Sequence, residues 1–166
     1  MDSHHSSNFE RAAESAPVPG RLAGIDFGTV RIGVAITDPA RRLASPLDNY
    51  TRRGPAGDAR YFCGLAETEA IKTFVVGLPV HLDGKESQKS IEARAFGQWL
   101  TETTGVPVVF FDERFTTAEA ERILGGAELS KKQRKARLDK LAAQIMLSAF
   151  LEAGQPAEQS PRSLDD

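Results

Sequence analysis

The sequence has only one cysteine, Cys63, among its 166 residues. This excludes a disulfide framework and a cysteine-rich zinc site, and a reducing, cytoplasmic setting is the default expectation. Long apolar runs are also missing, because runs such as 74–76 and 106–111 fall far short of the ~20 residues that cross a bilayer. The N-terminus has no apolar signal core, so neither secretion nor membrane insertion is expected.

A large net charge is missing as well, since the formal charge is −2 at pH 7. The charge is unevenly distributed, because 1–20 and 154–166 hold six acids and two bases, whereas 21–153 hold 17 acids and 19 bases. A local basic patch matters more to a polyanion than the overall sum does, although such a run can also be a solvated helical face. One ten-residue segment holds Lys131, Lys132, Arg134, Lys135, Arg137 and Lys140.

Composition divides the chain into one domain and two tails. Residues 1–20 are rich in serine, alanine and proline without a sustained apolar period, which predicts a disordered tail, and 154–166 give the same prediction. No internal repeat is found in the sequence. The remaining residues, 21–153, are enough to bury a core without disulfides, so a single domain is expected there.

Hydrophobic periodicity predicts strands alternating with helices in this domain. Pro46 confines its strand to a sheet edge, because proline cannot donate a ladder hydrogen bond. The apolar run 73–78 suits a strand buried on both faces. In chain order, the expected elements are strands at 21–27, 31–37 and 43–50, a helix at 55–70, a strand at 73–78, a helix at 86–104, a strand at 106–111, a short helix opened by a Thr116–Glu119 capping box, and a last helix at 138–152.

The order of these elements indicates the fold class. Residues 28–30 are turn-like and join the first two strands as a hairpin. Three antiparallel strands followed by alternating helices and strands predict an α/β domain with a five-stranded mixed sheet and helices on both faces. This is the plan of a ribonuclease-H-like domain.

Asp26 is an acid within an apolar strand that belongs at the centre of the sheet. A buried carboxylate needs a partner, a metal ion or a raised pKa, and the alternative is a cap for the following turn. Asp112 and Glu113 directly follow the last strand, where ligand groups of open α/β sheets collect. The next residue, Arg114, either neutralises this loop or holds a carboxylate or phosphate.

Asp139 is expected in the first turn of the last helix, where a role toward the helix dipole is the alternative to a catalytic one. The small residues Ala142 and Ala143 let that helix approach the sheet closely and carry the acid toward its centre. Three acids from two strands and a helix can share one site if a divalent cation balances their repulsion. Mg²⁺ and Mn²⁺ prefer oxygen ligands, and a pair of such ions supports phosphodiester hydrolysis.

Four segments carry a resemblance to a known family. GIDFGTVRIGVAITD (24–38), VVGLPVHLDG (75–84), DERFTTAEA (112–120) and LDKLAAQIMLSAFL (138–151) are similar to the YqgF/RuvX family of ribonuclease-H-like proteins, which are related to the RuvC-type Holliday junction resolvases. The resemblance implies a nuclease for the 5′ end of precursor 16S ribosomal RNA. It also implies cleavage of Holliday junctions or other branched DNA as a role proposed for some members.

Carried over to this sequence, the resemblance implies that Asp26, Glu113 and Asp139 are the catalytic acids and the ligands of two Mg²⁺ or Mn²⁺ ions. RuvC-type enzymes carry the second acid on the fourth strand, which has none here. Glu113 on the adjacent strand would be a shifted substitute, and Asp112 is the alternative ligand. The residues expected to bind substrate are Thr29, Arg31, Arg114, Lys131, Lys132, Arg134, Lys135 and Arg137.

Two other functions stay open at this point. The turn at Gly28 and Thr29 also resembles the phosphate-binding opening of actin-like ATPases and sugar kinases, but those proteins need a second domain and an adenosine loop, for which 21–153 has no room. A non-catalytic RNA-binding assembly factor could use the same fold. The expected partner is nucleic acid, either precursor rRNA or branched DNA, and the working unit is a monomer or a homodimer.

Overall fold

The computed structural model describes residues 18–79, 85–125 and 128–156, so most of both predicted tails lies outside it. None of the helices in these ranges is long and apolar enough to cross a membrane. The elements are β1 (Arg21–Asp26), β2 (Arg31–Thr37), β3 (Ala44–Thr51), α1 (Gly54–Thr68), β4 (Ile71–Leu78), α2 (Gln88–Thr104), β5 (Val108–Asp112), the 3₁₀ turn η2 (Glu113–Thr116), α3 (Thr117–Leu124) and α4 (Lys131–Glu152).

The strands form one sheet in the order β3-β2-β1-β4-β5. β2 pairs antiparallel with both β1 and β3, whereas β1, β4 and β5 run parallel. β3 is an edge strand, as Pro46 predicts, and Pro46 lies opposite Ala35 beside an irregularity in the pairing. The order and the directions confirm the predicted mixed sheet of a ribonuclease-H-like domain, with β1 at its centre.

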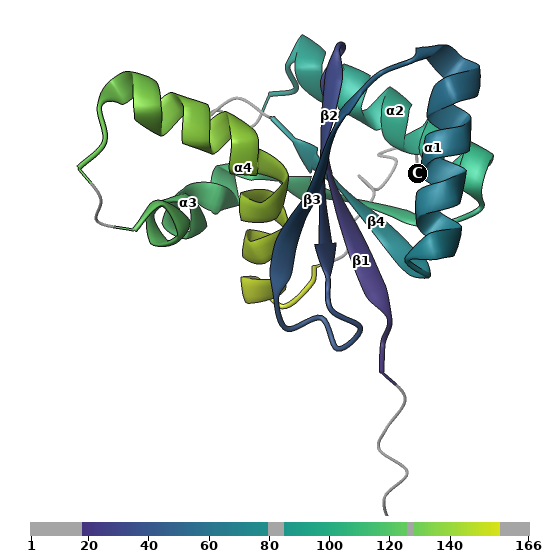
Figure 1. The fold of residues 1–166 in the computed structure, drawn as a ribbon, viewed down its shortest axis with the longest axis horizontal. Coiled ribbons are helices and arrows are strands. Elements are labelled where there is room, and N and C mark those ends of the chain that lie inside the picture. The colour runs from purple at the N-terminus through teal and green to yellow at the C-terminus, as the bar shows by residue number, and fades with distance from the viewer. Residues whose placement is uncertain (1–17, 80–84, 126–127, 157–166) are drawn as a thin grey trace, which may run out of the picture.

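Helices cover both faces of the sheet (Figure 1). α1 and α2 cover one face, where Phe62 and Phe96 pack with Phe74 of β4. α4 covers the other face, where Leu147 packs with Val75 of β4. Neighbouring residues of β4 thus enter different cores, which confirms that this strand is buried on both faces.

Glycines on the two central strands let α4 pack closely against the sheet. A Cβ atom at Gly24 of β1 would lie 2.9 Å from the Cβ of Leu147 and 3.3 Å from the carbonyl oxygen of Ala143. A Cβ atom at Gly33 of β2 would lie 3.4 Å from the Cβ atoms of both Ala143 and Asp26. The close approach predicted from the small helix residues is therefore real, and the sheet contributes to it equally.

The last helix begins earlier than the sequence pattern predicts. α4 starts at Lys131, about two turns before position 138. Ser130 and Gln133 form a capping box there, since each side chain accepts a hydrogen bond from the other residue's N–H, at 3.2 and 3.0 Å. Lysine and arginine are good helix formers, so the basic run lies on the helix. Asp139 is consequently in the third turn, and its predicted place in the first turn is wrong.

The predicted capping box at Thr116 and Glu119 is also wrong. The Thr116 hydroxyl donates to the carbonyl of Glu113 at 2.7 Å and so closes η2. The Glu119 carboxylate accepts from the Arg122 guanidinium at 2.8 and 2.9 Å. α3 therefore starts without a side-chain cap, because both partners are engaged elsewhere.

We expect Gly24→Ala to lower the free energy of unfolding by about 1–3 kcal/mol, because the new methyl group overpacks the contact of β1 with α4. Gly64→Ala is the matched control. Gly64 lies in α1 with open space around its Cβ position, so the same change should raise stability by up to about 1 kcal/mol. Urea unfolding of both variants measures the shifts, and equal effects at the two glycines would contradict the close packing of α4.

Candidate active site

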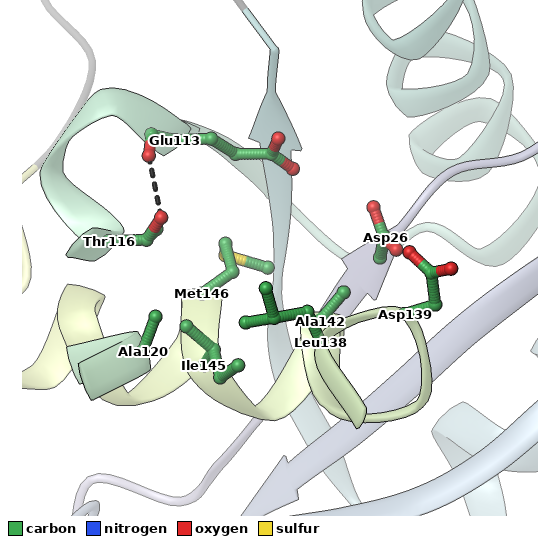
Figure 2. Close-up of a pocket in the computed structure, with 9 residues that line it drawn as sticks. All are labelled: Asp26, Glu113, Thr116, Ala120, Leu138, Asp139, Ala142, Ile145 and Met146. Atoms are coloured by element: carbon green, nitrogen blue, oxygen red, sulfur yellow. Dashed lines mark hydrogen bonds between the residues drawn. The ribbon is translucent and has the colours of Figure 1, made fainter. Parts of the chain in front are cut away.

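Three acidic side chains line one pocket at the end of β1 (Figure 2). Asp26 comes from β1, Glu113 from η2 and Asp139 from α4. The pocket has a volume of about 200 Å³. The structure therefore brings together the three acids that the sequence places far apart. The other residues that line the pocket are Thr116, Ala120, Leu138, Ala142, Ile145 and Met146.

Asp26 is the last residue of the central strand and lies opposite Gly33 of β2. Because side chains alternate along a strand, Asp26 shares the face of Gly24, which α4 covers. Burial raises the pKa of Asp26 above its ordinary value; the charge of Asp139 raises this pKa further, and Lys89 lowers it. Asp26 is half-buried, and a raised pKa is one of the three solutions expected for an acid within an apolar strand.

Glu113 reaches the pocket from the first residue of η2. Its carboxylate lies over Gly77 of β4, where a Cβ atom would collide with the Glu113 Oε1. Gly77 on β4 therefore leaves the space that the Glu113 carboxylate occupies, and Glu113 itself follows the neighbouring strand β5. Burial raises the pKa of Glu113 to about 7; the charges of Asp26 and Asp112 add to this rise, and Lys89 opposes it.

Asp139 is exposed on α4 and lies beside Asp26 (Figure 2). Ala143 follows Asp139 by four residues and therefore occupies the same side of the helix. Since Ala143 packs against the positions of Gly24 and Gly33, this contact holds the Asp139 side of α4 close to the end of β1.

The acids form a donor set suited to a hard divalent cation, since Mg²⁺ and Mn²⁺ prefer carboxylate oxygens. Asp26 and Glu113 have pKa values raised by burial and by the neighbouring acids, and a bound cation would oppose both effects. In the part of the chain that the structure describes, no three acidic, histidine or cysteine side chains lie close enough to hold one ion together. The acids fit such ions in the chemistry of their ligand atoms, and all three line the same pocket.

Asp112, the alternative second ligand, is engaged outside the pocket. One of its oxygens accepts from the Arg114 N–H at 2.9 Å, and the other lies 2.6 Å from Nη2 of the Arg114 guanidinium. Asp112 also continues the strand positions of Val108 and Phe110, which pack on the side of α2. Its side chain therefore leaves the sheet on the opposite face from Glu113, and neither Asp112 nor Arg114 lines the acidic pocket.

Thr29 and Arg31 lie near the pocket without lining it. Thr29 is in the turn after β1 and lines a neighbouring hollow together with Lys89 and Glu92, and the exposed Arg31 begins β2. Lys89, in the first turn of α2, lowers the pKa of both Asp26 and Glu113 and is therefore a site residue. Sequence patterns do not single it out; its one signal is its place after the loop that leaves β4, since ligands collect at this end of a sheet.

The basic run occupies the first turns of α4, which extend away from the sheet beside α3 (Figure 1). Arg134 forms an ion pair with Glu121 of α3. The basic run surrounds Asp139 in the sequence, so positively charged side chains lie on the same helix as one side of the acidic pocket. The other cations of the run, all exposed, are Lys131, Lys132, Lys135, Arg137 and Lys140.

A family model matches most of the chain. It is the model of RuvX, described as a Holliday junction resolvase, and it matches residues 20–153. The chain belongs to the RuvX family. This confirms the resemblance that the four sequence segments carry.

Known proteins similar to this RuvX-family chain include two with the printed name "Putative pre-16S rRNA nuclease". The protein of Rhodopirellula baltica is 52% identical over 142 residues, which cover 86% of this chain and 82% of that protein. The protein of Koribacter versatilis is 39% identical over 150 residues, which cover 90% and 98%. Among solved structures, RuvC of T. thermophilus in complex with a Holliday junction substrate has a TM-score of 0.46 and 14% identity, covering 83% of this chain and 98% of that one.

We expect the metal-free RuvX-family protein to lose stability as the pH rises from 4.5, the ordinary pKa of Glu113, through about 7, its pKa in the fold. The folded state binds this proton more tightly than the unfolded chain does, so the contribution is full below 4.5 and lost above about 7. It should be on the order of 2 kcal/mol. Thermal unfolding in chelating buffer from pH 5 to 8 measures it, and Glu113→Gln should flatten the profile. Parallel profiles for the two proteins would contradict the raised pKa.

Proposed function

We propose that this chain is a metal-dependent nuclease that cleaves phosphodiester bonds at the 5′ end of precursor 16S ribosomal RNA. The observation that carries the proposal is the convergence of Asp26, Glu113 and Asp139 on one pocket. The names of the relatives at 52% and 39% identity support this substrate. The family description supports a second class of substrate, Holliday junctions and other branched DNA.

The three acids would hold Mg²⁺ or Mn²⁺, with Glu113 as the second ligand because Asp112 is paired with Arg114. Such ions, when bound, balance phosphate charge and generate a nucleophile from water. Asp26 is the fixed member of the set, since β1 is hydrogen-bonded to strands on both sides. Without a cation the acids would repel a phosphate, and Lys89 offsets part of that repulsion by its position near Asp26 and Glu113.

Substrate binding would depend on cations outside the pocket. We propose that the basic residues of the first turns of α4 contact backbone phosphates and guide the strand toward Asp139. Phosphate contacts of this kind position a nucleic acid without reading its sequence. Thr29 and Arg31, at the other side of the end of β1, would contact the strand beyond the cleaved bond. The residues proposed on α4 are Lys131, Lys132, Arg134, Lys135 and Arg137.

We expect Asp26→Asn to abolish Mg²⁺- or Mn²⁺-dependent cleavage while the fold survives, because the change removes ligand charge and keeps the size of the side chain. The measurement compares precursor 16S rRNA and a four-way DNA junction side by side, with circular dichroism as the check on folding. Glu67→Gln, an exposed change on α1, is the control and should cleave at the parent rate.

Cleavage by Asp26→Asn at the parent rate would show that the acids are wrongly assigned. Tight RNA binding by the parent protein, without cleavage in either metal, would favour the non-catalytic assembly factor. Asp112→Asn tests the second ligand, since it should reduce cleavage much less than Glu113→Gln does.

The basic residues of α4 have a salt-dependent test. Lys131→Gln, Lys132→Gln and Lys135→Gln combined should weaken binding to all sequences and flatten the log–log salt dependence by about 2 for single-stranded RNA, since each lost phosphate contact contributes about 0.7. A double change of Arg60→Gln and Lys72→Gln, both exposed and in other elements, is the control. Filter binding between about 50 and 200 mM salt gives the slopes. An unchanged salt-dependence slope in the triple variant would show that the basic run is a solvated helical face that does not contact phosphates.

A further inference from the structure

A second hollow lies on the opposite side of the sheet from the acids, at the same end of β1. Phe27 follows Asp26 and packs with the core under α1 and α2, so the two side chains leave the chain on opposite faces. The hollow has a volume of about 370 Å³, and its lining residues are Phe27, Thr29, Arg52, Pro55, Glu92, Ala95, Phe96 and Trp99.

This hollow continues toward the acidic pocket. A smaller cavity of about 210 Å³ shares Phe27, Thr29 and Glu92 with it and adds Gly28 and Lys89. The two cavities adjoin at these shared residues, and together they are here called the aromatic groove, which extends from Trp99 to Lys89. Lys89 lies close enough to Asp26 and Glu113 to lower the pKa of each. One end of the aromatic groove is consequently next to the site where a phosphate would be cleaved.

The aromatic rings of the groove form a contiguous row and are inclined to one another. The ring centroids of Phe27 and Phe96 are 4.9 Å apart with 29° between their planes, and those of Phe96 and Trp99 are 5.5 Å apart with 33° between them. The Arg52 guanidinium lies 5.3 Å from the centroid of Phe27. The rings and the guanidinium all line the hollow, and they are flat groups of the kind on which unpaired bases stack.

Arg52 is held in this place by a buried anchor. Its Nε donates to the Asp58 carboxylate at 3.1 Å, and that carboxylate is fully buried and also accepts from the Tyr50 hydroxyl at 2.7 Å. A guanidinium fixed in this way loses little further freedom when a ligand stacks beside it. The groove is thus a built site with a positioned cation.

The polar groups of the groove favour a nucleobase over a hydrocarbon. Burying the Glu92 carboxylate under an apolar ligand would remove its charge from water, with the Gln88 side-chain amide, 3.5 Å away, as a weak donor. The Glu92 carboxylate only accepts hydrogen bonds, and a base edge with two adjacent N–H donors, as guanine has, matches its two oxygens. Uracil places carbonyl oxygens beside its single N–H and would repel the carboxylate.

We propose that the aromatic groove binds one unpaired base of the substrate strand, next to the cleaved phosphate, with a preference for guanine over uracil. The proposal rests on the proposed nuclease function and deepens it. A base within a duplex has its faces covered by neighbours and its Watson–Crick edge occupied, so it cannot enter the groove. The substrate is therefore single-stranded at this position.

Trp99 makes the proposal directly measurable, because it is the only tryptophan of the chain. The full-length protein is titrated in chelating buffer with short single-stranded oligouridylates, with the same oligomers carrying one guanine, and with a perfect duplex of the guanine sequence. We expect the guanine oligomer to quench Trp99 fluorescence at about 10-fold lower concentration than oligouridylate or the duplex.

Variants on one helix face separate the groove from other binding surfaces. Ala95→Met fills the groove from α2. It should weaken binding of the guanine oligomer by about 10-fold and abolish the quenching of Trp99 fluorescence. Gln98→Met puts the same side chain on the same helix outside the groove lining and should bind as the parent does. Glu92→Gln should retain stacking and lose most of the preference for guanine. Thermal unfolding of each variant checks the fold.

Each outcome distinguishes the groove from the nuclease function. Quenching by the single strand without any cleavage in Mg²⁺ or Mn²⁺ would support the groove and contradict the proposed function. Cleavage with unchanged Trp99 fluorescence, and with Ala95→Met at the parent rate, would overturn the groove and leave the function standing. Equal quenching by duplex and single strand would also overturn it, because binding would then follow backbone charge alone.

Discussion

The arrangement of the site depends on how closely α4 approaches the sheet. Gly24 and Gly33 leave space on β1 and β2 at their own positions, and Ala143 and Leu147 of the helix fill that space. A larger residue at any of these positions would lift the helix from the sheet, and Asp139 would move away from Asp26 with it. Packing of small residues in the core therefore sets the distance between two acids at the surface.

A missing side chain also explains the position of the second acid, Glu113. A carboxylate can occupy the end of β4 because Gly77 has no side chain there, and Glu113 extends from η2 into that space. Alternation along β5 decides which of two neighbouring acids is used. Asp112 leaves on the side of α2 and pairs with Arg114, whereas Glu113 leaves on the side of α4 and joins Asp26.

The fold was predictable from the sequence because its signals are local. Pro46 marks an edge strand and the apolar run of β4 marks a strand buried on both faces, and both follow from hydrogen bonding and burial alone. Asp26 was predictable because an acid within an apolar strand has few explanations. The start of α4 was not, since the basic run lacks an apolar stripe and its local signal is the short Ser130–Gln133 capping box.

The position of Asp139 beside the buried face of α4 was predictable, although the start of the helix was not. Its position relative to the buried residues that follow depends on the helical period, which is the same in the first turn as in the third. Sequence patterns could not predict that Lys89 lies near the acids or that Arg52 lines the groove. Both positions result from contacts between α1, α2 and the end of β1. Such contacts join segments that no periodicity links.

The acidic pocket and the aromatic groove lie next to each other at the end of β1 because side chains alternate along a strand. Consecutive residues point to opposite faces, so Asp26 enters the acidic pocket under α4 while Phe27 enters the aromatic groove beside α2. Under the two proposals above, a nucleic-acid strand that crosses this end of the sheet would meet the acids on one face and the surface for a base on the other. Because the two residues are adjacent, the separation between these sites is set by the backbone of β1, and the helices on either face determine only what each site can hold.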